Sequence, residues 1–188
     1  VLHLVNPSKR SRRRIRANLQ REAAARGISP TRIVFVERMP RRAHLIRVAD
    51  ADLFLDTFRY NAHTTATDAL WRGVPVVTLQ GPPGSFASRV AAGHLVNAGA
   101  PQLVTQTLRG FEATSVRLAH SPSLRRAARR LLLSENSIAE RGSVLGRSPL
   151  FNTAQTAKHI ISAYQTMREL QSNGVVPRHI IIAERMEQ

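Results

Sequence analysis

Four polar residues gather at the start of one expected helix. His63, Thr64 and Thr65 are consecutive, and Asp68 follows one turn later. A helix start presents free backbone N–H groups and the positive end of the helix dipole, so donors beside it favour a phosphate ligand. Asp68 lies within reach of a ribose joined to that phosphate. The simpler alternative is that a threonine caps the helix and Asp68 complements its dipole, and the residues alone do not separate the two.

A second group lies earlier, in a short helix expected to begin at Pro40. Arg41, His44 and Arg47 recur at i, i+3 and i+6 and share one face. An imidazole ring can pack on a nucleobase, and a guanidinium offers forked donors to carbonyl or ribose oxygens. A solvated basic helix is an equal alternative here.

The remaining candidates for chemistry are weaker. The loop 80–85 holds Gly81 and Gly84, which permit a ligand to approach the backbone, but it matches neither the Walker pattern nor the dinucleotide fingerprint. The other histidines lack metal-ligand spacing, and no pair of carboxylates resembles the acid and base of a glycosidase. The sequence therefore indicates a binding cleft more readily than a catalytic centre.

The elements that must position these residues follow a regular rhythm. Short apolar runs alternate with amphipathic stretches, which predicts an α/β fold with a Rossmann-like, doubly wound parallel sheet and helices on both faces. The apolar runs are residues 1–5, 33–36, 53–55, 76–79 and 103–104. Both polar groups follow such runs, at the carboxyl ends of strands, where open α/β sheets bind ligands.

Beyond the last run, three helical stretches predict a helical cap that closes the sheet. They cover residues 108–120, 123–133 and 152–170. In the last stretch an apolar stripe, typical of a core-facing helix, is formed by Ile160, Ile161, Tyr164 and Met167. We expect one lobe over residues 1–174 and an unassigned tail over 175–188.

Length and composition fit a single globular domain. The chain has 188 residues, 43% of them hydrophobic, and no cysteine, which excludes a disulfide framework. No apolar run approaches the roughly 20 residues that span a bilayer, so no membrane association is expected. The run at residues 1–5 resembles the middle of a buried strand, and we therefore expect a fragment of a longer protein.

The formal net charge of +16 comes almost wholly from arginine. Such a charge attracts polyanions and raises the alternative of a basic nucleic-acid-binding α/β module. The arginine clusters lack the interleaved aromatic residues that stack on bases. A solvated arginine surface is therefore the favoured interpretation.

Several motifs in register resemble the O-linked N-acetylglucosamine transferases together with the SPINDLY-type protein O-fucosyltransferases. They are Leu55-Asp56-Thr57, Asn61-Ala62-His63-Thr64-Thr65 with Asp68 and Leu70-Trp71, Gly73-Val74-Pro75-Val76-Val77-Thr78, Ala87-Ser88-Arg89-Val90-Ala91-Ala92, and Ser148-Pro149-Leu150-Phe151-Asn152. The resemblance covers about residues 1–170. It implies a GT-B glycosyltransferase, in which two Rossmann-like lobes face each other, and this chain is similar to the second, C-terminal lobe.

The resemblance also implies roles for the polar residues. In the first group, His63, Thr64 and Thr65 would hold the donor diphosphate and Asp68 the ribose. The second group would bind the uracil base and its ribose. His44 would pack on the face of the base, Arg47 would contact its edge, and the backbone of Met39 would pair with it. Arg41, where the family commonly has a lysine, would lie near the ribose.

The implied activity is inverting transfer of N-acetylglucosamine from UDP-GlcNAc to Ser or Thr of acceptor proteins, without metal or other cofactor. The catalytic base, a diphosphate-binding lysine and the TPR repeats that recruit acceptors would lie upstream of Val1, so the fragment alone is expected to be inactive. The His63-Thr64-Thr65 and Asp68 form favours UDP-GlcNAc over the alternative donor, GDP-fucose. A nucleotide-sugar epimerase is a third alternative, and a cytoplasmic or nuclear location is expected.

Overall fold

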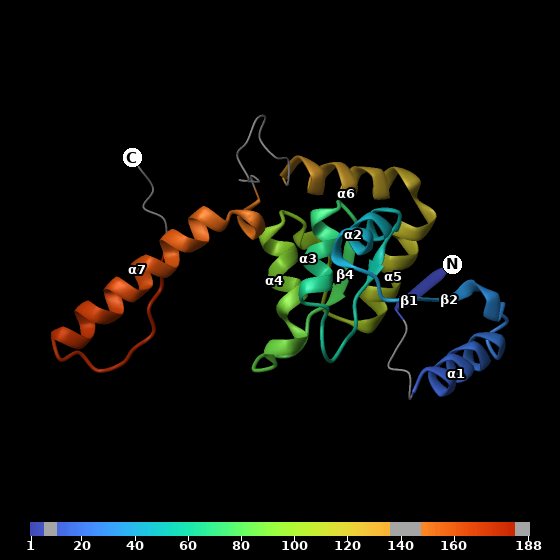
Figure 1. Ribbon diagram of the computed structural model, residues 1–188, viewed down its shortest axis with the longest axis horizontal. Coiled ribbons are helices and arrows are strands. Elements are labelled where there is room, and N and C mark those ends of the chain that lie inside the picture. The colour runs from blue at the N-terminus through green and yellow to red at the C-terminus, as the bar shows by residue number, and fades with distance from the viewer. Residues whose placement is uncertain (6–10, 136–147, 183–188) are drawn as a thin grey trace. The chain divides into compact units, whose positions relative to one another are not determined.

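The computed structural model describes residues 1–5, 11–135 and 148–182, and the chain divides into two compact units, Val1–Arg47 and Val48–Gln188 (Figure 1). In both units the strands are parallel and helices connect them, as the apolar rhythm of the sequence predicts.

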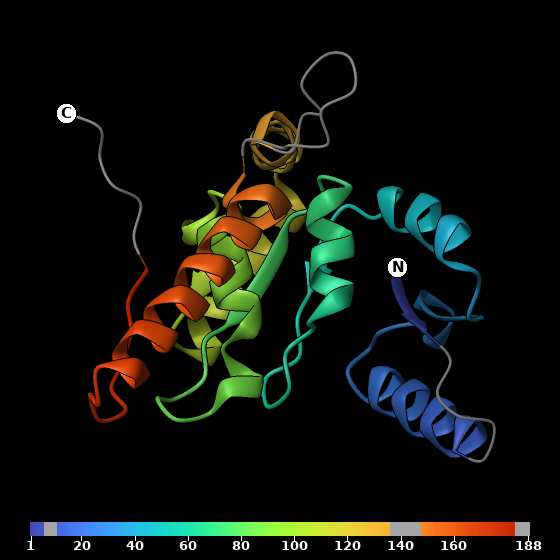
Figure 2. The ribbon, with the colours of Figure 1, turned by 60° about the vertical axis from the view of Figure 1, so that its left-hand side comes forward.

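The first unit is a β-α-β arrangement followed by a helix. Strands β1 (Leu2–Val5) and β2 (Ile33–Val36) pair in parallel, with Leu2 opposite Ile33. Helix α1 (Arg12–Ala24) connects them and packs along β2 (Figure 2), and α2 (Arg41–Ala49) follows β2. A single 3₁₀ turn, Pro30–Arg32, precedes β2.

Burial in this unit differs from the expectation of a buried opening strand. Val1, Leu2 and Val5 are 78%, 45% and 48% exposed. Within the described residues β1 pairs only with β2, so its side chains have few neighbours. Shortly after the end of α1, Gly27 adopts φ 70°, a conformation that glycine takes without strain.

The second unit contains the better-packed sheet, in the order β3-β4-β5. Its strands β3 (Phe54–Leu55), β4 (Val76–Leu79) and β5 (Val104–Thr105) are all parallel. In the central strand β4, Val76 and Val77 are fully buried. This burial on both faces matches the continuous apolar run in the sequence.

Helices cover the central strand and one another. Helices α3 (Thr64–Trp71), α4 (Val90–Asn97) and α5 (Leu108–His120) pack on β4, and α6 (Pro122–Glu135) packs on α3 and α5 (Figure 1). Two 3₁₀ turns, Phe86–Ser88 and Pro101–Leu103, precede α4 and β5.

Gly73 explains how α3 ends so close to α6. It adopts φ 73°, and a Cβ at this position would lie 2.7 Å from Cγ of Leu133 on α6. A side chain here would therefore strain the backbone and force the Leu133 side chain to move.

The segment that begins at Ser148 packs against α4 and α3. Ser148 is fully buried and donates its hydroxyl to the carbonyl of Asn97 at 2.9 Å. Phe151, in the 3₁₀ turn Pro149–Phe151, meets Trp71 edge-on at a centroid distance of 4.9 Å. Asn152 then caps the next helix by accepting from the backbone N–H of Gln155.

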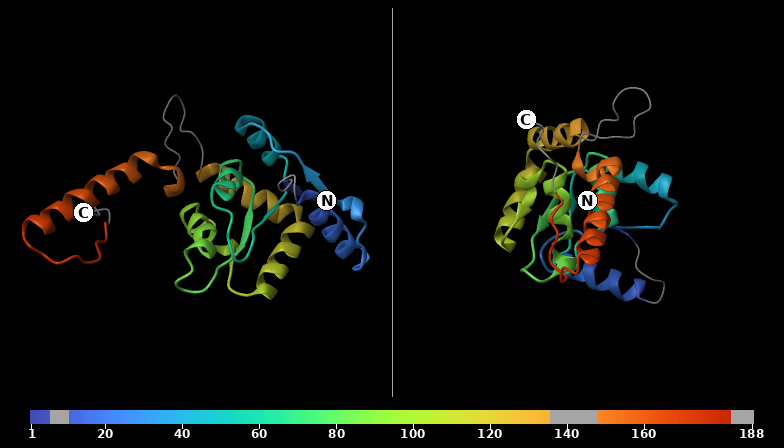
Figure 3. Two further views of the ribbon diagram at one scale, coloured as in Figure 1. Left: turned by 60° about the horizontal axis from the view of Figure 1, so that its bottom comes forward. Right: turned by 90° about the vertical axis from the view of Figure 1, so that its left-hand side faces the viewer.

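That helix, α7 (Thr153–Ser172), is one continuous helix (Figure 3). Its apolar stripe was expected to face a core, and this is wrong for the present structure. The stripe residues are all 49–67% exposed: Ile160, Ile161, Tyr164 and Met167. Across the parts of the chain that are described, no helix has the length and apolar character needed to cross a membrane.

Candidate functional site

A buried carboxylate shapes the loop between β3 and α3. Asp56, only 4% exposed, directly follows β3, and its Oδ1 accepts from the backbone N–H groups of Thr57 at 2.8 Å and Ala62 at 2.6 Å. Its Oδ2 accepts from the hydroxyl of Thr78 on β4 at 2.6 Å. Asp56 thus ties both ends of the loop to the central strand. We call residues 56–68 the α3 corner.

The start of α3 is open, as a phosphate site requires. His63 occupies the N-cap position, and no side chain caps the helix. Thr64 and Thr65 are exposed, and within the described chain no hydrogen bond involves their backbone N–H groups. The alternative in which one of these threonines serves as the cap therefore does not hold, since both lie inside the helix.

Asp68 differs from its neighbours in the α3 corner. It is 5% exposed and already interacts within the protein. Its expected contact with a ribose stays a prediction.

A second loop is joined to the α3 corner by backbone contacts. Asn61 donates its backbone N–H to the carbonyl of Ala87 at 2.8 Å, and His63 Nε2 lies 3.4 Å from the same oxygen. Gly81 donates to the carbonyl of Ser88 at 2.8 Å, and a Cβ on Gly81 would overlap the Ser88 side chain. The close approach that Gly81 permits is therefore to Ser88 rather than to a ligand.

The electrostatic setting of the α3 corner includes His94 from α4. Burial lowers the pKa of His94, the nearby positive charge of His63 lowers it further, and Asp56 acts in the opposite direction. The imidazole of His94 therefore favours its neutral form.

Two aromatic residues at this corner escaped the sequence analysis. The ring of Tyr60 stacks on His63 with 4.7 Å between centroids and an interplanar angle of 17°. The ring of Phe86 meets the His63 ring edge-on, with 6.2 Å between the centroids. The available signal was the occurrence of large aromatic residues in otherwise polar turns of a chain with only 5% aromatic residues.

The other predicted residues lie in the first unit. We call residues 39–47 the α2 corner. Arg47 donates its Nη1 to the carbonyl of Glu37 at 2.8 Å, and its Nη2 lies 3.4 Å from Nδ1 of His44. Met39 and Arg41 are exposed. The structure thus brings His44 and Arg47 together on α2, and Met39 and Arg41 precede them.

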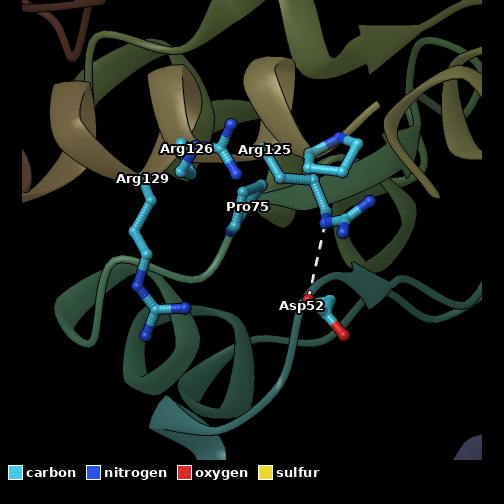
Figure 4. A pocket seen from close by; sticks show the side chains of 6 residues that line it. Asp52, Pro75, Arg125, Arg126 and Arg129 are labelled. Carbon is cyan, nitrogen blue, oxygen red and sulfur yellow. Dashed lines mark ion pairs between the residues drawn. The ribbon is translucent and has the colours of Figure 1, made fainter. Parts of the chain in front are cut away.

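A pocket of about 160 Å³ in the second unit lies between α6 and the segment before β3 (Figure 4). Arg125 pairs with Asp52 through Nε at 3.4 Å and donates to the carbonyls of Leu118 and Ala119 at the end of α5. Arg129 donates to the carbonyls of Ala49 and Ala51. These arginines therefore join α6 to the ends of neighbouring helices, which explains part of the arginine excess structurally.

The described residues contain no group of three or more histidines, aspartates and glutamates placed to hold a metal ion. The α3 corner offers an open helix start and an imidazole, which suit an anionic ligand. The α2 corner separately offers a forked guanidinium, which suits acceptor oxygens.

Comparison with known families gives a match over most of the chain. The family model described as Glycosyl transferase family 41 matches residues 10–160. An Arabidopsis thaliana protein named as a probable UDP-N-acetylglucosamine–peptide N-acetylglucosaminyltransferase, SEC, is 33% identical over 164 residues, which cover 86% of this chain and 16% of that protein. The UDP-N-acetylglucosamine–peptide N-acetylglucosaminyltransferase of Caenorhabditis elegans is 41% identical over 101 residues, 54% of this chain and 9% of that protein.

Among solved structures, an O-GlcNAc transferase mutant of Thermobaculum terrenum matches with a TM-score of 0.64 and 28% identity, covering 83% of this chain and 31% of that one. This likeness confirms the predicted fold of parallel strands with flanking helices. The chain spans only 16% and 9% of the two relatives named above.

Proposed function

Because the chain belongs to Glycosyl transferase family 41, we propose that it is the donor-binding part of a protein O-N-acetylglucosaminyltransferase. The observation that carries this proposal is the open start of α3, where His63, Thr64 and Thr65 stand without a side-chain cap. An end of this kind offers backbone N–H groups to a diphosphate.

The proposed donor is UDP-GlcNAc, because the relatives in Arabidopsis thaliana and Caenorhabditis elegans carry that donor in their names. The α3 corner takes the diphosphate and, through Asp68, the ribose. The α2 corner takes the uracil, with His44 on its face and Arg47 on its edge. The comparisons give no support to GDP-fucose as the donor or to nucleic-acid binding.

The proposed reaction is inverting transfer to a Ser or Thr hydroxyl of an acceptor protein. As the bond from the sugar C1 to the phosphate oxygen breaks, negative charge develops on the departing diphosphate. The first-turn N–H groups of α3 and His63 stabilise that charge. The catalytic base and the acceptor-binding repeats are proposed to come from the rest of the protein, no metal or other cofactor is invoked, and the proposed location is cytoplasmic or nuclear.

Calorimetric titration of UDP and UDP-GlcNAc into the chain tests the proposal. The sharpest variant is Thr65→Asp, because a carboxylate in the first turn stabilises a helix through its dipole but repels a diphosphate. We expect the melting temperature to hold or rise while UDP affinity falls by about 100-fold, which corresponds to about 2.7 kcal/mol. His63→Ala should weaken UDP by about tenfold.

The matched control is Thr153→Asp. Thr153 is the exposed first residue of α7, whose start is already capped by Asn152, so UDP binding should not change. Equal affinity of UDP for the wild-type chain and Thr65→Asp would refute the site. Tighter binding of GDP-fucose than of UDP-GlcNAc would overturn the donor, and binding of random oligonucleotides that survives His63→Ala would favour a nucleic-acid module.

A further inference from the structure

Two exposed aromatic rings border the proposed diphosphate site. Tyr60 is 65% exposed and Phe86 is 79% exposed, although aromatic residues make up only 5% of the chain. Most of their ring surface is therefore in contact with solvent, and the protein forgoes the free energy that burial of this apolar surface would give. Exposed rings beside polar donors are typical of sites that bind ligands with both apolar and polar parts.

The loops that carry both rings are held by hydrogen bonds of their backbone. The carbonyl of Tyr60 accepts the hydroxyl of Thr57, and the Tyr60 ring stacks on His63. The neighbour of Phe86, Ala87, accepts the backbone N–H of Asn61. Both rings thus contact His63, and the two loops that carry them are joined by a backbone hydrogen bond, which limits the conformational freedom that these loops lose when a ligand binds.

The chemistry of the donor decides what these rings contact. In a nucleotide sugar the diphosphate joins a nucleoside on one side to a hexose on the other. Asp68, the proposed ribose contact, lies within α3, whereas Tyr60 and Phe86 lie in the turns outside its first residue. A diphosphate on the Thr64 and Thr65 N–H groups therefore directs its hexose toward the two rings.

We propose that Tyr60 and Phe86 form an aromatic wall that packs against the C–H face of the donor hexose and positions the sugar for transfer. The C–H groups of a pyranose carry partial positive charge and match the negative face of an aromatic ring. The Tyr60 ring is the main contact, because it stacks on the His63 ring, with 4.7 Å between the centroids, beside the proposed diphosphate site. This inference rests on the proposed function and adds the residues that hold the sugar.

The test compares UDP with UDP-GlcNAc, which differ by the hexose. Titrated into the full chain, Tyr60→Ala is expected to weaken UDP-GlcNAc by about five- to tenfold and to leave UDP within about twofold. Tyr60→Phe keeps the ring and should keep the affinity, and Phe86→Ala should lower UDP-GlcNAc affinity by a smaller factor. Saturation transfer from aromatic protons to the hexose C–H groups should be seen in the wild-type chain and be lost in Tyr60→Ala.

The matched control is Tyr164→Ala on α7, a tyrosine with almost the same exposure, 67%, which should change neither affinity. Because Tyr60 is exposed, its removal should leave the melting temperature within about 2 °C. If UDP binds but Tyr60→Ala weakens neither ligand, the wall is refuted and the proposed function stands. Equal weakening of the binding of both ligands would show that Tyr60 acts only through His63, and this outcome also refutes the wall. If the folded wild-type chain does not bind UDP, both proposals are refuted.

Discussion

The α3 corner and the α2 corner are predicted to bind two parts of one ligand, yet they are built differently. The α3 corner is organised by a buried carboxylate, Asp56, which accepts hydrogen bonds from two backbone N–H groups of its own loop and from the hydroxyl of Thr78 on β4. In the α2 corner, Arg47 donates to the carbonyl of Glu37 at 2.8 Å, and its Nη2 lies 3.4 Å from Nδ1 of His44. Met39 and Arg41 at its start are exposed.

This difference indicates a division of labour. A diphosphate site needs N–H groups fixed before the ligand arrives, because charge stabilisation depends on preorganised dipoles. A base site can be completed by side chains that adjust, since stacking and edge contacts tolerate small movements. We therefore expect changes in the α3 corner to affect folding and binding together, and changes in the α2 corner to affect mainly binding.

The largest expected effect tests the buried carboxylate. Asp56→Ala leaves two backbone N–H groups and the Thr78 hydroxyl without their acceptor, and should lower the free energy of unfolding by about 3 kcal/mol. Chemical denaturation measures this. The control is Asp52→Ala, whose side chain is 82% exposed and pairs with Arg125, and which should cost below about 1 kcal/mol. Similar losses in the two variants would remove the distinction between the corners.

The next effect tests the loop that borders the α3 corner. Gly81→Ala places a methyl group onto the Ser88 side chain, which is 2% exposed and cannot move into solvent, so a loss of about 2 kcal/mol is expected. Gly93→Ala in α4 is the control, because nothing lies within 4 Å of its added Cβ and alanine favours a helix. Thermal denaturation should therefore separate the two substitutions in sign. A partial rescue by Ser88→Gly would identify the overlap as the cause.

Much of this architecture follows from the sequence, because strands buried on both faces and glycine stops leave strong local signals. The runs at Ile33–Val36 and Val76–Leu79 are strands with the predicted bounds, and the helix at Leu108–His120 also matches. Gly73, where α3 ends, adopts φ 73°, a conformation that favours glycine. These features depend on neighbouring residues alone.

The parts that the sequence did not predict depend on distant partners. Asp56 looks like any polar residue after a strand, and its importance arises from Thr78 on the next strand. The stripe on α7 has the period of a core helix, but period does not reveal whether a partner surface is present. Likewise the excess of arginine was interpreted as a solvated surface, with a polyanion site as the alternative, whereas Arg125 and Arg129 donate to carbonyls at the ends of neighbouring helices.

A smaller effect is expected from the α2 corner. Arg47→Ala removes the donor to the Glu37 carbonyl and should lower the free energy of unfolding by about 1 kcal/mol, while weakening UDP by about fivefold. Arg47→Lys keeps the charge but not the forked donors, and should recover stability better than affinity. Denaturation and calorimetry on the same samples give both values. A loss of stability as large as that of Asp56→Ala would show that the α2 corner is equally preorganised.

The smallest effect is a pH dependence near the α3 corner. His94 has a lowered pKa in the folded chain, mainly through burial and then through His63, so the unfolded chain binds more protons once the pH falls through the usual value of 6.5. The stability that neutral His94 supplies is therefore complete above that pH and is lost as the pH falls from there toward the lowered pKa. Because the side chain is partly exposed, the change in melting temperature between pH 7.5 and 5.5 should be only about 1–2 °C. His94→Gln should remove the pH dependence of the melting temperature in this range. His63→Ala should reduce that dependence, because it removes one of the causes of the lowered pKa of His94. A pH dependence unchanged in both variants would mean that the charge of the α3 corner has no electrostatic effect on His94 in α4.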